Sequence, residues 1–397
     1  MPGHHAVLVH DQLEARRFLE EIGSTPMGVG FMVPKAVFKC IKLKNIPARA
    51  ANILKQEMLA NGGEAAVGHN AARCEGTTDM LLMGTLKQYR RLIAKLRLQP
   101  FGLKAVAAEI KAILANLEIE TWQVPLAQGK VLELGKRSLV MGILNVTPDS
   151  FSDGGRFFAP AAAVEHALQM AADGADIIDV GGASSRPGSQ MVDEAEELRR
   201  VLPVVERLSA LGLTIAVDTF RAGVAQAALE AGAHLINDIG GLAMDRGLLP
   251  VLVKWQAPVV LMHNRLQIRQ DEPYTDLIAD IIRELQSAME QAAAAGLGPE
   301  RILIDPGLGF GKNPAQNLEI IRRLQDFRSL GRPILIGASR KRFIGHALDL
   351  DTSERLEGSL AAAVMAVMNG AAVVRVHDVK ESARVMRMTD AVRWNLG

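Results

Sequence analysis

The sequence predicts an α/β protein, namely a (β/α)8 TIM barrel preceded by a small α/β N-terminal domain. Beyond Ser138, short runs of Val, Ile and Leu alternate with longer amphipathic segments, and eight such units fit into about 260 residues. The runs lack polar alternation, as is typical of strands buried on both faces of a parallel sheet. Polar, glycine-rich sequence follows nearly every run, and in a barrel these loops meet on one face. The alternative is a doubly wound open sheet, which usually has fewer strands and a glycine-rich first turn.

Composition narrows the class of protein. Of the 397 residues, 49% are hydrophobic and 22% are charged, which excludes a disordered, collagen-like or disulfide-scaffold chain. The 45 basic residues nearly cancel the 44 acidic ones, so no global basic field attracts nucleic acid or an acidic membrane. The two cysteines make no disulfide framework, and neither a signal peptide nor a membrane-spanning stretch is evident. We expect a soluble cytoplasmic protein.

We expect residues 1–135 to form the small α/β domain and its linker, and residues 136–397 to form the barrel. No catalytic constellation occurs in the first part, so we expect a structural or assembly module, with a second activity as the open alternative. A chain that begins near Val131 should then keep the core reaction. Within this part we expect strands over 37–43 and 79–85, helices over 48–61, 86–98 and 102–117, and a linker over 124–136.

The barrel elements follow in order along the chain. The eight expected strands lie within residues 138–146, 175–182, 213–219, 233–239, 257–263, 301–307, 332–337 and 371–378. The amphipathic segments that predict helices are 161–173, 194–211, 221–231, 276–295, 317–330 and 356–368.

Several strand ends offer hydrogen-bonding groups for a flat ring. Asp305 ends an apolar run, and the glycines of the following PGLGFGK segment let a backbone come close to a ligand. Asp218 and Asn237 stand at equivalent strand ends. Together these groups suit the amino-amide edge of a pterin or a guanine. For any single aspartate, a helix N-cap is the alternative interpretation.

The later loops predict an anion site. Ser339, Arg340, Lys341 and Arg342 follow the seventh run, while Arg375 and His377 flank the end of the eighth. Loops after strands 7 and 8 are frequent phosphate sites of barrels, and guanidinium forks suit phosphate or carboxylate oxygens. We therefore expect an oligophosphate to bind here.

The first loop, residues 145–156, is long and polar, which predicts a mobile lid. Asn145 and the aspartates of this loop supply hard oxygen ligands for Mg²⁺, which usually completes its shell with substrate phosphate. No general base or nucleophile is evident. A reaction driven by loss of diphosphate needs mainly positioning and charge stabilisation, and so fits such a site.

From Ser138 to the C-terminus the chain resembles the dihydropteroate synthases, the folate-pathway enzymes that sulfonamides target. The signature MGILNVTPDSFSDGG runs intact over residues 141–155, and DPGLGFGK, GASRKRF and RVHDV follow in order. The resemblance implies condensation of 6-hydroxymethyl-7,8-dihydropterin diphosphate with p-aminobenzoate, which gives 7,8-dihydropteroate and diphosphate. Diphosphate leaves first, and the aromatic amine then attacks a pterin cation. A homodimer is also expected.

The resemblance also implies roles for individual residues. Asn145 would ligate Mg²⁺, and Asp218, Asp305 and Lys341 would be the catalytic groups, with Asp218 stabilising the cation. The pterin pocket would consist of Asp218, Asn237, Met262, Asp305 and Lys341. Contacts to p-aminobenzoate would come from Phe151, Ser185, Arg186, Pro187, Ser339 and Arg340. The diphosphate would be held by Asn145, Arg186, Arg375 and His377.

The chain departs from the family pattern in its second loop. This loop commonly contains GGESTRPG, whereas here it is GGASSRPG, so that Ala183 removes a carboxylate and Ser185 lacks a methyl group. These changes bear on affinity for p-aminobenzoate and sulfonamides rather than on the reaction. Two rival functions remain. A methyltetrahydrofolate-dependent corrinoid methyltransferase has no need for the first-loop signature, and a paralogue that only binds pterins has no need for the diphosphate groups.

Overall fold

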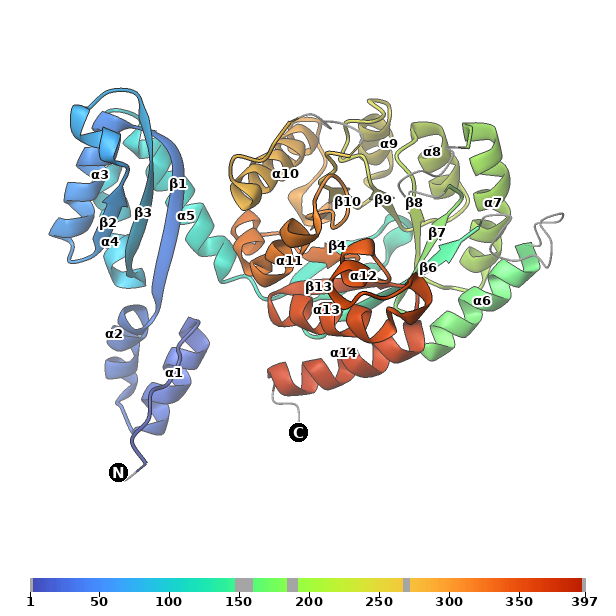
Figure 1. Cartoon of the computed structure of the whole chain (residues 1–397), viewed down its shortest axis with the longest axis horizontal. Coiled ribbons are helices and arrows are strands. Elements are labelled where there is room, and N and C mark those ends of the chain that lie inside the picture. The colour runs from blue at the N-terminus through green and yellow to red at the C-terminus, as the bar shows by residue number, and fades with distance from the viewer. Residues whose placement is uncertain (1–2, 147–159, 184–191, 267–271, 395–397) are drawn as a thin grey trace. The chain divides into compact units, whose positions relative to one another are not determined.

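The computed structural model describes residues 3–146, 160–183, 192–266 and 272–394 (Figure 1). The chain divides into two compact units, Met1–Glu118 and Ile119–Gly397. This division lies earlier than the boundary after residue 135 that the sequence suggests. Residues 122–134, which include most of the expected linker, form a β-hairpin that packs against the barrel. In the described part of the chain, no helix is long and apolar enough to cross a membrane.

The first unit is a small α/β domain around a three-stranded antiparallel sheet with strand order β1-β3-β2. Exposure alternates along β1, where Ile41 and Leu43 are buried while Cys40 and Lys42 are exposed, so one face of the sheet packs on the helices. The expected strands and helices are present, together with α1, α2 and β2, which were not predicted. The elements are α1 (Gln12–Glu21), α2 (Pro26–Ala36), β1 (Phe38–Pro47), α3 (Ala48–Ala60), β2 (Glu64–Val67), η1 (His69–Arg73), β3 (Thr77–Thr85), α4 (Leu86–Leu96) and α5 (Leu103–Leu117).

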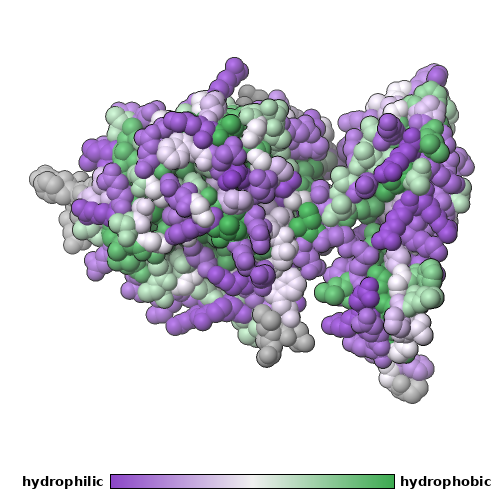
Figure 2. All heavy atoms as spheres, turned by 180° about the vertical axis from the view of Figure 1, so that it is seen from behind, coloured by the Kyte–Doolittle hydropathy of each residue, from purple (hydrophilic) through white to green (hydrophobic). Residues whose placement is uncertain are grey.

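The face of the molecule drawn in Figure 2 is mainly hydrophilic, with hydrophobic side chains scattered over both units. In the first unit, α2 buries Val29 and Val33 but exposes Met27 and Phe31. This helix is therefore apolar on both sides, which explains why periodicity did not predict it.

The second unit is a closed barrel of eight parallel strands with order β6-β7-β8-β9-β10-β11-β12-β13, as predicted. The strands are β6 (Leu139–Asn145), β7 (Ile177–Gly181), β8 (Ile215–Asp218), β9 (Leu235–Asp238), β10 (Val259–Met262), β11 (Ile302–Asp305), β12 (Ile334–Ile336) and β13 (Ala371–Val376). The helices are α6 (Pro160–Asp173), α7 (Glu194–Ala210), α8 (Ala222–Glu230), α9 (Leu248–Trp255), α10 (Leu277–Ala294), α11 (Pro314–Arg322), α12 (Arg342–Leu348), α13 (Leu356–Met368) and α14 (Val379–Trp394). Short 3-10 helices are η2 (Ala127–Gly129), η4 (Pro299–Arg301), η5 (Leu324–Leu330) and η6 (Thr352–Glu354).

One expected helix is divided in two. The sequence predicts a single helix over 317–330, whereas α11 ends at Arg322 and η5 begins at Leu324. Arg323 leaves helical geometry at φ −108° and ψ 20°. Leu324, Phe327 and Leu330 are all buried, so the 3-10 turn keeps the apolar side chains of this segment on the barrel.

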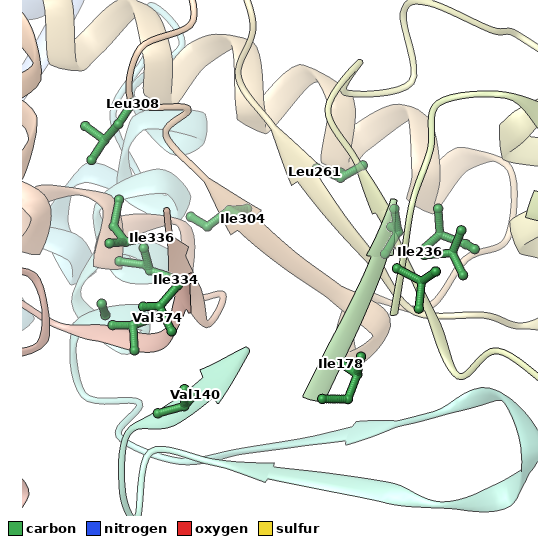
Figure 3. Packing of buried hydrophobic residues seen from close by; sticks show 14 of the residues in the cluster. Val140, Ile178, Ile236, Leu261, Ile304, Leu308, Ile334, Ile336 and Val374 are labelled. Carbon is green, nitrogen blue, oxygen red and sulfur yellow. The ribbon is translucent and has the colours of Figure 1, made fainter. Parts of the chain in front are cut away.

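Alternate residues of each strand face the two sides of the barrel wall. The outward set packs under the surrounding helices and includes Val140, Ile178, Ile236, Leu261 and Ile304 (Figure 3). The inward set at the N-terminal end forms a separate apolar cluster. Its strand members are Leu139, Met141, Ile177, Ala216, Leu235, Val260, Leu303, Leu335 and Val373, and Ala372 joins them at a register shift of β13.

A hairpin of β4 (Trp122–Pro125) and β5 (Val131–Leu134) covers this end of the barrel. Val124, Leu126 and Leu134 are buried in the same cluster as the inward strand residues. The Ala127 N–H donates to the carbonyl of His234 at 3.0 Å, and Arg301 donates to the carbonyl of Pro125 at 2.9 Å. The hairpin is therefore part of the barrel core, and the linker prediction was wrong for it.

Candidate active site

In five of the eight strands, a polar side chain occupies the next inward position toward the C-terminal end. Since side chains alternate along a strand, the residue two places after an inward apolar residue faces inward again. By this spacing Asp179 follows Ile177 and Asp305 follows Leu303. The inward layer obtained in this way consists of Ile143, Asp179, Asp218, Asn237, Met262, Asp305, Gly337 and Arg375.

Arg375 joins two carboxylates across the barrel. Its Nε donates to Asp179 Oδ2 at 2.6 Å, and its Nη2 donates to Asp218 Oδ2 at 2.7 Å. Asn237 Nδ2 also donates to Asp179 Oδ2, at 3.0 Å. Burial raises the pKa of the Asp218 carboxyl, and the Arg375 guanidinium opposes this rise. The structure thus brings together three of the predicted residues around Asp179.

Asp305 and Lys341 lie beside this ionic cluster. Asp305 Oδ1 accepts the Gly307 N–H at 2.7 Å, and burial raises the pKa of Asp305 against the influence of Lys341. Lys341 donates to the carbonyl of Leu308, and burial lowers the pKa of this ammonium to about 8. Its Nζ also lies 5.0 Å from the centroid of the Phe310 ring. A buried carboxylate and a buried amine therefore stand next to an aromatic face.

An apolar wall borders these polar groups. Met262 and Phe310 pack with Ile239, and the half-buried Phe220 contacts the same cluster. Gly307 adopts φ +71°, and a Cβ there would lie 2.0 Å from the carbonyl oxygen of His263. The glycine is therefore required by packing against the end of β10, whereas the sequence analysis assigned such glycines to ligand approach.

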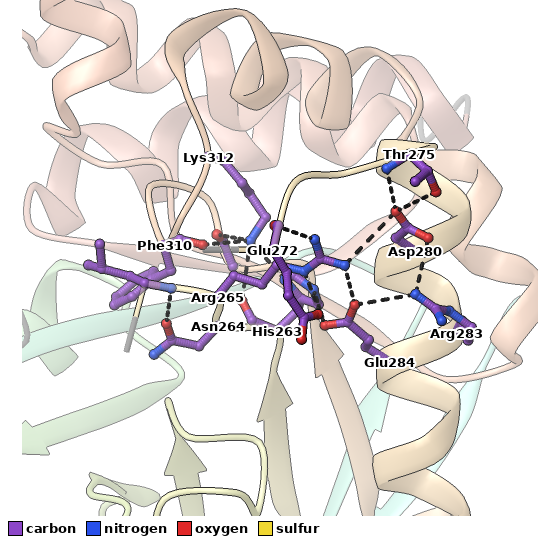
Figure 4. A network of polar contacts seen from close by, with 12 residues as sticks. His263, Asn264, Arg265, Glu272, Thr275, Asp280, Arg283, Glu284, Phe310 and Lys312 are labelled. Carbon is purple, nitrogen blue, oxygen red and sulfur yellow. Dashed lines mark hydrogen bonds and ion pairs between the residues drawn. The ribbon is translucent and has the colours of Figure 1, made fainter. Parts of the chain in front are cut away.

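A second buried network, made of polar contacts, holds the Gly307–Lys312 loop in place (Figure 4). Lys312 Nζ donates to the carbonyls of Gly307 at 2.9 Å and Phe310 at 3.0 Å, and lies 2.9 Å from His263 Nδ1. His263 Nε2 lies 3.0 Å from Glu284 Oε2, and Arg265 pairs with the same carboxylate. Burial lowers the pKa of Lys312 to about 7 and that of His263 to about 4. This network fixes the loop rather than presenting groups to a ligand.

Comparison with known proteins places this geometry in a family. Residues 141–377 match the family model for pterin binding enzymes. The dihydropteroate synthase of Bacillus subtilis is 45% identical over 280 residues, which cover 70% of this chain and 97% of the relative. The chain belongs to the dihydropteroate synthase family. Enzymes of this family are transferases of folate biosynthesis, and this chain is one of them.

Two further relatives extend the comparison. A Xanthomonas albilineans dihydropteroate synthase, solved in complex with 7,8-dihydropteroate, superposes with a TM-score of 0.62 at 41% identity and covers 68% of this chain and 98% of its own. A probable bifunctional folylpolyglutamate synthase/dihydropteroate synthase of Halobacterium salinarum is 42% identical over 383 residues. That match covers 96% of this chain but only 46% of the relative. Similarity to the halophile protein therefore extends into the N-terminal unit.

Of the remaining dihydropteroate synthase residues predicted from the sequence, some lie in the described part of the chain and others lie outside it. Ser339 Oγ lies 3.0 Å from His377 Nδ1 and accepts the His377 N–H at 3.2 Å, so these two are joined. Arg340 has φ +56° and pairs with Asp378, at 3.0 Å from its Nε. Asn145 ends β6 and is half-buried. Four predicted residues lie outside the described part of the chain, namely Phe151, Ser185, Arg186 and Pro187.

Sequence reasoning missed Asp179. The other site residues stand at, next to or beyond a strand end, whereas Asp179 lies within β7, two residues before its end. The signal was available, because an aspartate inside a run of Ile and Val at an inward position is unusual in a buried strand. The Lys312 network was missed because its partners come from three separate segments.

Proposed function

We propose that this chain condenses 6-hydroxymethyl-7,8-dihydropterin diphosphate with p-aminobenzoate and releases 7,8-dihydropteroate and diphosphate. The observation on which this mainly rests is the inward polar layer next to the Met262–Phe310 wall, which matches a flat, hydrogen-bonding heterocycle. The complex of the Xanthomonas albilineans relative with 7,8-dihydropteroate supports the same chemistry.

The pterin ring is bound by the inward layer. Asp305 and Asn237 offer a carboxylate and an amide for the amino-amide edge of the ring. Lys341, whose ammonium is buried, donates to a ring acceptor, and Met262 packs on the ring face. Binding replaces the hydrogen bond between Lys341 and the Leu308 carbonyl with one to the substrate. A buried site of this kind discriminates strongly because an unmatched ring leaves polar groups unpaired.

Charge stabilisation drives the chemical step. Loss of diphosphate leaves a pterin cation, and the Asp218 carboxylate stabilises it from the barrel wall. Arg375 lies within hydrogen-bonding distance of Asp218 and offers a guanidinium to the leaving diphosphate. Arg375 and His377 both come from the β13 end, so the diphosphate binds at that side of the mouth. Ser339 and Arg340 at the neighbouring loop contact p-aminobenzoate, together with Phe151, Ser185, Arg186 and Pro187.

Mg²⁺ completes the diphosphate site in this proposal. Asn145 offers a single neutral oxygen, and no group of three or more His, Cys, Asp or Glu side chains suited to a metal occurs within the described residues. This donor set fits a Mg²⁺ that arrives with diphosphate oxygens as its other ligands. When bound, the ion neutralises charge on the leaving group. Titration should show weak Mg²⁺ binding alone and much tighter binding with diphosphate, and equal affinities would contradict the proposal.

The decisive experiment measures diphosphate release by the full chain. Release should require both the pterin diphosphate and p-aminobenzoate, with 7,8-dihydropteroate formed in equal amount. A protein that binds the pterin substrate but releases no diphosphate would be a binding module. Activity as a corrinoid methyltransferase would instead appear as methyl transfer from methyltetrahydrofolate. Either result would overturn the proposed function.

A further inference from the structure

Asp179 has the most deeply buried charged side chain of the site. It lies outside the sequence motifs from which the site was predicted. Its side chain is fully buried on β7. Oδ2 accepts hydrogen bonds from Arg375 Nε and Asn237 Nδ2 at 2.6 and 3.0 Å. Oδ1 is also buried and has no hydrogen-bond partner among the described residues. The carboxylate is therefore satisfied on one side only.

The partners of Asp179 come from distant strands. Arg375 lies on β13 and Asn237 on β9, and each of these strands is separated from β7 by one intervening strand of the barrel. A single oxygen thus connects two groups on opposite flanks of β7. In the described part of the chain no backbone amide donates to Asp179, in contrast to Asp238, which accepts the N–H groups of Gly240 and Leu242.

This arrangement is costly for the fold alone. A buried carboxylate with an unpaired oxygen loses hydration that its partners replace only in part. The equivalent inward positions one layer lower are Ile177 and Ala216, which show that the barrel packs well with apolar residues. We therefore attribute the Asp179 carboxylate to the function of the site and not to packing of the barrel core.

We propose that Asp179 is a positioning residue, which fixes the Arg375 guanidinium and the Asn237 amide in the orientation that binds the pterin diphosphate. The proposal rests on the function proposed above. Because Nε of Arg375 is held by Asp179, the guanidinium stays at the mouth when its Nη2 leaves Asp218 for substrate oxygens. The same oxygen holds Asn237 with its amide group beside the ring site.

The test compares Asp179→Asn and Asp179→Ala with wild type in the diphosphate-release assay on the full chain. Loss of one charge-assisted hydrogen bond weakens binding on the order of 10- to 100-fold. We expect the KM for the pterin diphosphate to rise by that factor in Asp179→Ala and less in Asp179→Asn. The KM for p-aminobenzoate should stay within about twofold, because neither partner of Asp179 belongs to its proposed site.

A matched control separates positioning from stability. Asp390 is buried as well, but it accepts the backbone and hydroxyl hydrogens of Ser138 at 2.8 Å, next to the N-terminal end of β6. Asp390→Asn should lower the melting temperature and leave both KM values unchanged. If folded Asp179→Asn and Asp179→Ala behave like Asp390→Asn, with lower stability and unchanged KM, the proposal is wrong.

A double-mutant cycle keeps the proposal testable if Asp179→Ala does not fold. Because Asp179 acts in part through Arg375, Asp179→Asn should raise the pterin KM by a clearly smaller factor in an Arg375→Ala background than in wild type, the remainder being the contribution of Asn237. Fully additive effects would overturn the proposal. Turnover by wild type in the same assay separates the two proposals. If wild type releases no diphosphate, the proposed function is wrong. If wild type is active and the Asp179 variants have the same KM values, only the role of Asp179 is wrong.

Discussion

The two ends of the barrel are built from the same eight strands but carry different side chains. At the N-terminal end, inward residues such as Met141 and Leu303 are apolar and pack against Val124 and Leu134 of the hairpin. At the C-terminal end, most of the next inward residues are charged or amide side chains, and four of them, Asp179, Asp218, Asn237 and Arg375, are joined by hydrogen bonds. One end is closed by apolar contacts, and the other keeps buried charges close to the mouth.

This difference separates stability from function along the strands. Apolar burial at the lower end contributes free energy of folding without chemical specificity. Buried ionic groups at the upper end contribute little net stability, because desolvation offsets their attraction. A substitution at the lower end should therefore change stability and leave both KM values almost unaltered, whereas one at the upper end should change substrate binding or turnover.

The largest effect is expected at the upper end. Asp305→Ala and Lys341→Ala should each abolish measurable binding of the pterin substrate, because a buried charged partner is lost from the ring site. Calorimetric titration measures this directly, and the melting temperature of each variant serves as the folding control. Unchanged affinity in both folded variants would remove these residues from the pterin pocket.

At the lower end, the corresponding change is Leu134→Ala in the hairpin. Leu134 is 1% exposed, so truncation leaves a cavity and should cost about 2–5 kcal/mol of unfolding free energy. Both KM values should be unchanged. Denaturant unfolding and steady-state kinetics on the same preparation test this, and a large rise in either KM with little loss of stability would break the comparison.

A smaller effect concerns pH and His234, which also lies at the lower end. Its Nδ1 accepts the Ile215 N–H at 3.2 Å, and burial lowers its pKa to about 4. Between that value and the unfolded pKa of about 6.5, the unfolded state binds more protons, so stability falls as pH drops through this window. In His234→Asn, which keeps an acceptor, the fall from pH 7 to pH 4 should be smaller by about 3 kcal/mol. Equal pH slopes of unfolding free energy would contradict it.

The smallest effect is expected from removal of the first unit. That unit has its own core of residues such as Leu54, Leu82 and Tyr89, and the core of the barrel is a separate cluster. A chain that begins at Ile119 keeps the hairpin, unlike one that begins at Val131, and its kcat/KM should stay within about twofold of the full chain. A folded but inactive shortened chain would show that the first unit takes part in the reaction.

Much of this comparison could be predicted from the sequence, for physical reasons that also define the limits. The strands were predictable because buried parallel strands are continuous apolar runs, and Asp218, Asn237 and Asp305 were found because they end such runs. Asp179 was not found, because its role depends on which face of β7 it occupies. The hairpin was not predicted either, because Val124 and Leu134 are recognised as core residues only when the strand residues that they cover are known.

The most direct test of the account is the rate of diphosphate release by Asp218→Asn at saturating substrates. The substitution keeps the size of the side chain and removes the carboxylate that stabilises the pterin cation. We predict a loss of kcat on the order of 100-fold or more, as for other preorganised electrostatic groups, and the melting temperature serves as the folding control. A folded Asp218→Asn protein with a kcat near the wild-type value would contradict the assignment of the chemistry to the polar end of the barrel.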